Sequence, residues 1–336
     1  MRRLLVPVVA VVAVLGAVSG CSSTDDAVRK VERSTDEISR VVRAELPTPR
    51  TEVAGAAFDD GTIIVVGGLT ADGKASDLVH LHDGDADEWT EGPRLPAPVH
   101  HTQVVAARGR VYVVGGFAAA EGNEWVESAA VWSIGRNDTE WRPEPPLTSP
   151  RGALGAAATE DGTIVAFGGV SRGTVTATTE VLRPQATTWE KGPDMSEPRE
   201  HLAATNIDGR IFAIAGRAGS LESNKRTVES WDPSGREGSW RREPHLVEAR
   251  GGIAAAGRCV AGGEEPTGTI GTIECLGPDR DGGERAWRTI TSMRQARHGL
   301  AVIAIGDRLH IISGGDKPGL FVTGTHEVIL GAKADG

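Results

Sequence analysis

The sequence is poor in the residues that carry redox, metal and nucleic-acid chemistry. Its 336 residues include three cysteines and one tyrosine, Tyr112, and the formal net charge is −10. Such an acidic chain repels a phosphate backbone, so we expect no nucleic-acid partner. Neither Cys259 nor Cys275 has a further cysteine or histidine at the spacing of a zinc site, and we expect neither a metal nor a cofactor.

Glycine is abundant by contrast, with 44 residues, and its placement is periodic. Six apolar runs of the type GRVYVVGG (109–116) each end in a pair of small residues, at intervals of about fifty residues. A fixed period of this length indicates a repeat architecture, not six separate motifs. The pairs are Gly67-Gly68, Gly115-Gly116, Gly168-Gly169, Ala215-Gly216, Gly262-Gly263 and Gly314-Gly315.

Each repeat reads as four short antiparallel strands. A small-residue strand opens after Pro-Arg or Ala-Arg, a turn follows, and the apolar strand then ends in the small pair. A third strand of the type TVESWDP (227–233) precedes a fourth strand that carries a tryptophan. Four such strands make one blade of a β-propeller, in which the glycines allow close approach of backbone from the next blade. The tryptophans are Trp89, Trp141, Trp189, Trp240 and Trp287.

Together, the double glycine, the third-strand pattern, the spaced tryptophan and the Pro-Arg entry resemble the kelch repeat. The resemblance runs from about residue 45 to 331 and implies an all-β, six-bladed kelch-type β-propeller over 39–331, with a tail at 332–336. The sequence departs from the pattern at Ala215 and at PVHH (98–101).

The strand count predicts how the ring closes. There are six small pairs and six third strands, the last being THEVILG (325–331), but only five tryptophan strands. Aligning RVVRAELPTPR (40–50) with WTEGPRLPAPV (89–99) puts residues 40–45 in the position of the missing strand. We therefore expect the N-terminal end of the domain to supply the outer strand of the last blade and close the ring.

The first residues have the pattern of a bacterial lipoprotein signal. A basic start and a continuous apolar stretch precede Val18-Ser19-Gly20-Cys21, which resembles the lipobox whose cysteine is diacylated. We expect residues 1–20 to be the signal peptide and 21–38 to be a lipidated N-terminus and tether. Acylated Cys21 would hold the protein on the extracytoplasmic face of a cell membrane. The alternatives are a simple cleaved signal and a single membrane span.

Two cysteines are expected to pair. Cys259 lies on the second strand of the fifth repeat and Cys275 on its third strand, so they should face each other. An oxidising exterior favours a disulfide, and the alternative is two buried thiols that only pack.

One set of side chains indicates a ligand site. The arginine that opens each innermost strand, with nearby histidines, should gather at one mouth of the central channel. The alternative is that the arginines bond backbone around the rim, and the two uses are compatible. The predicted site residues are Arg50, His100, His101, Arg151, Arg199, His201, Arg250, Arg297 and His298.

The expected function is binding, not catalysis. Galactose oxidase, a kelch enzyme, needs two tyrosines at its copper, so the lone Tyr112 excludes that chemistry. The leading interpretation is a membrane-anchored binding or scaffold module of the cell envelope, whose partner is a protein or an anionic glycan or peptide bound by the arginines. The alternative is a carbohydrate-active enzyme resembling the sialic-acid mutarotase kelch proteins, with Glu200 and His201 as acid/base candidates.

The anchor is tested by mass spectrometry of the native membrane form. Residues 1–20 should be missing and Cys21 should carry acyl mass. Cys21→Ser should abolish membrane retention and leave the propeller folded, because residues 22–38 only tether it. An unmodified, soluble product of the native gene would contradict the anchor.

Overall fold

The structure is a computed structural model that describes residues 38–119, 125–277 and 285–332. The predicted signal peptide, Cys21 and nearly all of the tether lie outside the described residues, as does most of the predicted tail. No helix among the described residues is long and apolar enough to cross a bilayer.

The described chain is all-β, as predicted, and a single 3₁₀ turn at Leu221–Ser223 is the helical element among the described residues. Six antiparallel sheets of the described chain each contain four main strands, in order from the inner to the outer edge. In this order the sheets are β2 (Ala54–Ala57), β3 (Ile63–Val66), β4 (Val79–Asp83), β5 (Glu88–Glu91); β7 (Gln103–Ala107), β8 (Arg110–Val114), β11 (Val131–Gly135), β12 (Arg142–Pro143); β13 (Gly155–Ala158), β14 (Ile164–Phe167), β17 (Thr179–Leu182), β18 (Glu190–Lys191); β19 (Ala203–Ile207), β20 (Arg210–Ile214), β21 (Val228–Trp231), β22 (Arg241–Glu243); β23 (Gly251–Ala256), β24 (Cys259–Glu265), β26 (Thr272–Gly277), β27 (Ala286–Ser292); and β28 (Ala301–Ile305), β29 (Arg308–Ile312), β30 (His326–Leu330), β1 (Ser39–Arg43).

The loops between the main strands contain further short strands. β25 (Gly268–Thr269) pairs with β24. The hairpin of β15 (Val170–Ser171) and β16 (Thr174–Val175) stands by itself, and β6 (Val99–His100), β9 (Phe117–Ala119) and β10 (Trp125–Glu127) form a small sheet in the second repeat.

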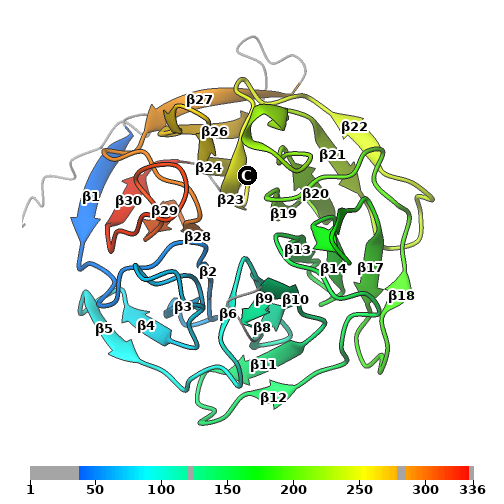
Figure 1. The fold of residues 1–336 in the computed structure, drawn as a ribbon, viewed down its shortest axis with the longest axis horizontal. Coiled ribbons are helices and arrows are strands. Elements are labelled where there is room, and N and C mark those ends of the chain that lie inside the picture. The colour runs from blue at the N-terminus through cyan, green and yellow to red at the C-terminus, as the bar shows by residue number, and fades with distance from the viewer. Residues whose placement is uncertain (1–37, 120–124, 278–284, 333–336) are drawn as a thin grey trace, which may run out of the picture. The chain divides into compact units, whose positions relative to one another are not determined.

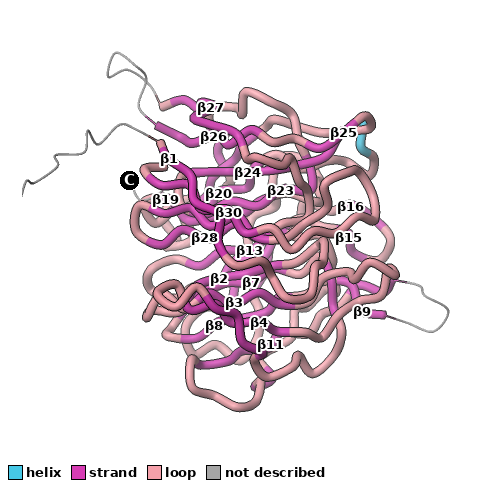
Figure 2. Tube along the Cα trace, turned by 90° about the vertical axis from the view of Figure 1, so that its left-hand side faces the viewer, coloured by secondary structure: helices cyan, strands magenta, loops and turns pink. Residues whose placement is uncertain are grey.

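The sheets stand around a central axis (Figure 1). Each inner strand contacts the inner strands of two neighbouring sheets, in the series β2, β7, β13, β19, β23, β28 and back to β2. The outer strands β1, β5, β12, β18, β22 and β27 lie at the periphery in the same view. Figure 2 shows the strands from the side, one above another, from β27 near the top of the view to β11 near the bottom.

The small pairs join each sheet to the next. The N–H of the second residue of each pair donates to the carbonyl that precedes the next inner strand, at 2.8–3.0 Å, and a Cβ on Gly67 would lie 2.6 Å from the Val99 oxygen. Close backbone approach is therefore the reason for the glycines. The six bonds run from Gly68 to Val99, Gly116 to Arg151, Gly169 to Arg199, Gly216 to Arg250, Gly263 to Arg297 and Gly314 to Arg50.

The last pair differs from the prediction by one residue. Ser313 and Gly314, not Gly314 and Gly315, have the left-handed backbone found at the other pairs, with φ of 64° and 101°. The Ser313 hydroxyl donates to the Arg50 carbonyl at 2.6 Å. A side-chain hydrogen bond explains why serine is accepted where other repeats have glycine or alanine.

The tryptophans make a second connection between sheets. Four indole N–H groups donate to a carbonyl that follows the outer strand of the preceding sheet, which satisfies the one polar atom of a mostly buried ring. The bonds join Trp89 to Ala44, Trp141 to Pro93, Trp189 to Pro145 and Trp240 to Pro193, at 2.7–2.9 Å.

The N-terminal strand pairs where the sequence alignment places it. β1 is antiparallel to β30, with Ser39 opposite Leu330 and Arg43 opposite His326. Ala44, just after β1, is the residue that accepts the indole of Trp89 in the first sheet. The strand is two residues shorter at its end than the predicted 40–45.

A buried histidine cluster lies between the first and last sheets. His310 Nδ1 is 3.0 Å from His326 Nε2, and the His326 ring lies 4.8 Å from that of His82. Burial lowers the pKa of His310 to about 4 and of His326 to about 3, so both imidazoles are neutral at pH 7.

The fifth sheet contains a disulfide. Cys259 on β24 stands directly opposite Cys275 on β26, with Cα atoms 4.1 Å apart, and the two sulfurs are bonded. Both residues are buried.

Truncation tests the role of β1. Deleting residues 22–35 should leave the melting temperature unchanged, because β1 stays intact. Deleting residues 22–45 exposes the edge of β30 and removes the acceptor of Trp89, so it should lower the melting temperature by on the order of 5 °C or more. Calorimetry on the two proteins makes the comparison, and equal melting temperatures would contradict the structural role of β1.

Candidate functional site

Six residues near the axis form a ring of equivalent positions, which we call the axial ring. Each stands two residues after the arginine position of a repeat, which is Val99 in the second repeat, and lies at the start of an inner strand. Each has a left-handed backbone with φ between 50° and 71°. Because the inner strands run in the same direction, all six lie at one end of the axis. The axial ring consists of Glu52, His101, Ala153, His201, Gly252 and Gly299.

Backbone hydrogen bonds hold the axial ring rigid. The N–H of five members donates to the carbonyl of the member in the preceding sheet, at 2.9–3.2 Å. At the sixth position the N–H of Val53, not of Glu52, donates to the Gly299 carbonyl at 3.2 Å. The Cα positions of all six are thus set by neighbouring sheets. The bonds run from His101 to Glu52, Ala153 to His101, His201 to Ala153, Gly252 to His201 and Gly299 to Gly252.

Three side chains of the axial ring converge. Glu52, His101 and His201 each offer one metal-ligating atom, and these atoms lie within 4.8 Å of one another. His101 Nε2 is 3.2 Å from Glu52 Oε2, and the His101 and His201 rings meet edge to face at 4.7 Å. The three line a central cavity of about 90 Å³, which has room for several water molecules.

Glycine next to Glu52 in the axial ring leaves room for the Glu52 side chain. A Cβ on Gly299 would lie 2.5 Å from Glu52 Oε1 and 2.6 Å from the Thr51 hydroxyl. Its φ of 59° also disfavours a side chain. Gly299 is therefore required by the position of Glu52.

His298 is the imidazole of the site whose surroundings favour protonation. Its Nδ1 lies 3.2 Å from Glu52 Oε1, and its Nε2 lies 3.0 Å from the Lys317 carbonyl. Both ring nitrogens thus face acceptors, which favours the protonated form. Burial opposes the charge, but the hydrogen bond to Glu52 and the nearby carboxylates raise the pKa of His298.

The other groups have the opposite protonation states. Burial raises the pKa of the Glu52 carboxyl, but the imidazoles of His101 and His298 more than offset this and hold it well below its usual value. Burial lowers the pKa of His101, and lowers that of His201 well below its usual value. At neutral pH the site therefore holds a carboxylate beside two neutral imidazoles.

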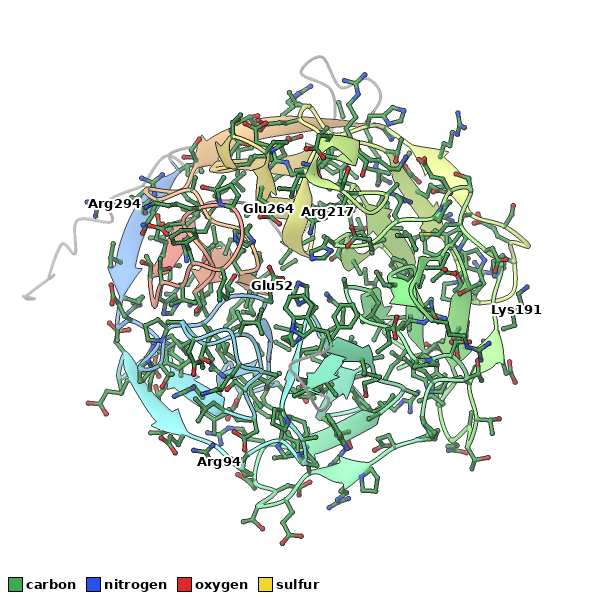
Figure 3. The ribbon with its side chains drawn as sticks, viewed as in Figure 1. Glu52, Arg94, Lys191, Arg217, Glu264 and Arg294 are labelled. Atoms are coloured by element: carbon green, nitrogen blue, oxygen red, sulfur yellow. A yellow bond between two sulfur atoms is a disulfide. The ribbon has the colours of Figure 1, made fainter. Side chains whose placement is uncertain are left out.

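A chain of charged side chains surrounds this centre. Glu200 Oε2 contacts His201 Nδ1, and Glu200 Oε1 accepts from Arg217 Nε at 3.0 Å. Arg217 also donates to Glu264 at 2.8 Å. Figure 3 shows Glu52, Arg217 and Glu264 near the axis, while Arg94, Lys191 and Arg294 lie toward the periphery. Three acidic side chains, Glu52, Glu200 and Glu264, thus surround Arg217 and His298.

An aromatic surface adjoins the polar groups. Trp125 on β10 is 52% exposed, and its ring lies 4.4 Å from His100 and 5.5 Å from His101. Phe117 packs against both histidines. His100 Nδ1 is 2.5 Å from His101 Nδ1, so it supports the axial ring from outside.

The five predicted arginines do not line the site. All are fully buried, and in each the Nη1 atom donates to two carbonyls of its own sheet. The Nη2 atom faces a third-strand side chain, which is a glutamate in four cases and His80 in the first. The pairs are Arg50–His80, Arg151–Glu180, Arg199–Glu229, Arg250–Glu274 and Arg297–Glu327, at 2.6–3.2 Å.

The prediction of a positive, arginine-lined mouth is therefore corrected. Guanidinium groups that are buried and hydrogen-bonded within their own sheets, four of them to a glutamate, cannot reach a ligand. Of the nine predicted residues, the structure brings together His101, His201 and His298, and places His100 next to them.

Sequence reasoning missed Glu52, Arg217, Glu264 and Trp125. A signal for three of them was present in the repeat. Glu52 stands two residues after Arg50, as His201 does after Arg199, and Arg217 and Glu264 directly follow a small pair. Trp125 lies in a variable loop and had no such signal.

Substitution of an arginine tests whether the buried arginine–glutamate pairs brace, that is stabilise, the sheets. Arg199→Ala leaves Glu229 buried without its partner and should cost about 3–5 kcal/mol of the free energy of unfolding. Arg236→Ala, on the surface, should change it by less than about 0.5 kcal/mol. Chemical denaturation measures both. Equal stability of the two variants would contradict a bracing role, and Arg199→Met with Glu229→Leu should recover much of the loss.

Comparison with known proteins agrees with the repeat pattern. The Kelch motif family matches residues 151–196 and 198–246, which contain β13–β18 and β19–β22. The Kelch-like protein terF of Aspergillus terreus is 25% identical over 82% of this chain and 63% of its own length. The Kelch-like protein 41a of Danio rerio is 25% identical over 55% of this chain and 30% of its own.

A solved structure shares the fold. The protein titled "Structure of YjhT" superposes with a TM-score of 0.70 and 15% identity, covering 84% of this chain and 95% of that chain. The chain spans less than two thirds of the length of the kelch-like relatives above. The matched motifs, the kelch-like relatives and the shared fold support a kelch-repeat family for this protein.

Proposed function

We propose that the six sheets are the blades of a six-bladed kelch propeller, closed non-covalently by β1. Three contacts between the last and first sheets support this proposal: the pairing of β1 with β30, the Gly314–Arg50 hydrogen bond and the indole bond of Trp89 to Ala44. A closed ring of sheets with short, protected edges suits a rigid recognition surface.

We further propose that the protein is a binding module of a bacterial cell envelope, held on the extracytoplasmic face of the membrane by acylated Cys21. The lipobox-like Val18-Ser19-Gly20-Cys21 and the Cys259–Cys275 disulfide support a location outside the cytoplasm. Scaffold and ligand-binding roles are both consistent with kelch repeats.

The ligand binds, in this proposal, over the axial ring. The observation that carries it is the convergence of Glu52, His101 and His201 from different sheets around one cavity, beside the exposed ring of Trp125. His298 contacts Glu52 from behind. A few polar groups next to an aromatic face are typical of ligand sites. The cavity is too small for a whole sugar, so the ligand would lie across its opening.

The charges favour an uncharged ligand over the anionic one expected from the sequence. Arg217, the guanidinium beside the site, is bonded to Glu200 and Glu264. The carboxylates would repel an acidic sugar but accept hydrogen bonds from sugar hydroxyls, and neutral imidazoles can donate and accept. We propose a neutral glycan whose apolar face packs on Trp125.

A glycan array with the full chain in mild detergent tests this proposal. Neutral glycans should bind, with little effect of added salt, and Trp125→Ala should weaken binding by about tenfold, or ~1.4 kcal/mol. Val247→Ala is the matched control, because Val247 is 59% exposed but has no place in the site. Salt-sensitive binding of acidic glycans, or equal loss in both variants, would contradict the proposal.

A second candidate is a carbohydrate-active enzyme resembling the sialic-acid mutarotase kelch proteins. The observation that favours it is the contact of Glu200 with the neutral imidazole of His201, an arrangement suited to a general base. NMR measurement of anomer exchange on any bound sugar separates the two candidates. Exchange that is lost in His201→Gln supports the enzyme, and binding without exchange supports the module.

A further inference from the structure

We propose that Glu52, His101 and His201 form a zinc site, with one coordination position open toward the central cavity. Two histidines and one glutamate are the protein ligands of several zinc sites that keep a fourth position for water. The three residues are the set of metal-ligating groups that the described residues bring together. The proposal goes beyond glycan binding and does not depend on it.

The distances suit a small dication after modest side-chain rotation. Ligand atoms around a tetrahedral zinc stand about 3.3 Å apart, which follows from zinc–ligand distances of about 2.0–2.1 Å. His101 Nε2 and Glu52 Oε2 already stand 3.2 Å apart, and all three ligand atoms lie within 4.8 Å. Because backbone bonds hold the axial ring, only rotation about side-chain bonds is needed.

Each ligand residue is also held from behind. Glu52 Oε1 is bound by His298, which leaves Oε2 toward the centre. His101 Nδ1 contacts His100, and His201 Nδ1 contacts Glu200, which leaves the Nε2 atom of each imidazole for a metal. Such outer partners orient metal ligands and are a regular part of metal sites.

The surroundings of the three ligands provide space and charge. Ala153, Gly252 and Gly299 carry no ligating side chain and leave the cavity beside the three ligands. Three acidic side chains, Glu52, Glu200 and Glu264, lie near one arginine, Arg217, so a dication improves the local balance of charge.

Calorimetric titration of the tag-free full chain in detergent with Zn²⁺, after EDTA treatment and desalting, is the direct test. We expect one Zn²⁺ per chain, not displaced by excess Ca²⁺, which requires more oxygen ligands. Glu52→Gln and His201→Gln should each weaken binding at least tenfold. His245→Gln is the control, because its imidazole is exposed and remote in sequence from the site, and it should bind as the unaltered protein does.

Circular dichroism will show whether each variant folds. If one does not, two further measurements on the unaltered protein still test the proposal. Co²⁺ bound to the unaltered protein should give the visible absorption of a four-coordinate site. Anomalous scattering at the zinc edge should place the metal between Glu52, His101 and His201. No binding, unchanged affinity in folded Glu52→Gln and His201→Gln, a six-coordinate Co²⁺ spectrum, or a metal found elsewhere would each overturn the proposal.

Discussion

The structure depends on one hydrogen bond, which recurs between successive sheets. The second residue of each small pair donates its N–H to the carbonyl at the entry of the next inner strand, and in five of the six cases that carbonyl belongs to an arginine. The guanidinium of the same arginine bonds two carbonyls of its own sheet. One residue thus fastens its own sheet through the side chain and the preceding sheet through the backbone. Buried charge is tolerated because both Nη atoms of the arginine are hydrogen-bonded and, in four repeats, one of them bonds a glutamate.

This arrangement decides which residues are left for function. Two positions after the arginine site, the chain turns through a left-handed residue that faces the axis. Side chains there have no bracing duty, so their identity can differ from one repeat to the next without loss of the fold. Glycine and alanine at three of the six positions leave a cavity, while Glu52, His101 and His201 supply polar groups beside it. The chemistry of the site is therefore carried by the variable positions of a rigid ring.

Much of the fold could be predicted because each repeat has the same sequence pattern. Period, four-strand order and the pairing of residues near 40–43 with the last sheet follow from aligning the repeats, and the bond from Trp89 to Ala44 repeats that from Trp141 to Pro93. The alignment failed where a side chain replaced a glycine. At Ser313 a hydroxyl bonds the Arg50 carbonyl, so the position does not need glycine, and a count of glycine pairs shifts by one residue.

The sequence by itself determined the all-β repeat, the place of β1 and the cysteines that pair, because these depend on local patterns that recur along the chain. Only the tertiary structure decided which charged residues are available to a ligand. Arg151 and His201 look equally suited to an axial site in the sequence, but the glutamates that neutralise the arginines lie about thirty residues further along the chain. Likewise, Glu52, His101 and His201 come from three repeats and meet only when the sheets are arranged around one axis. Burial and partnership are properties of the folded ring, and they determine both charge and access.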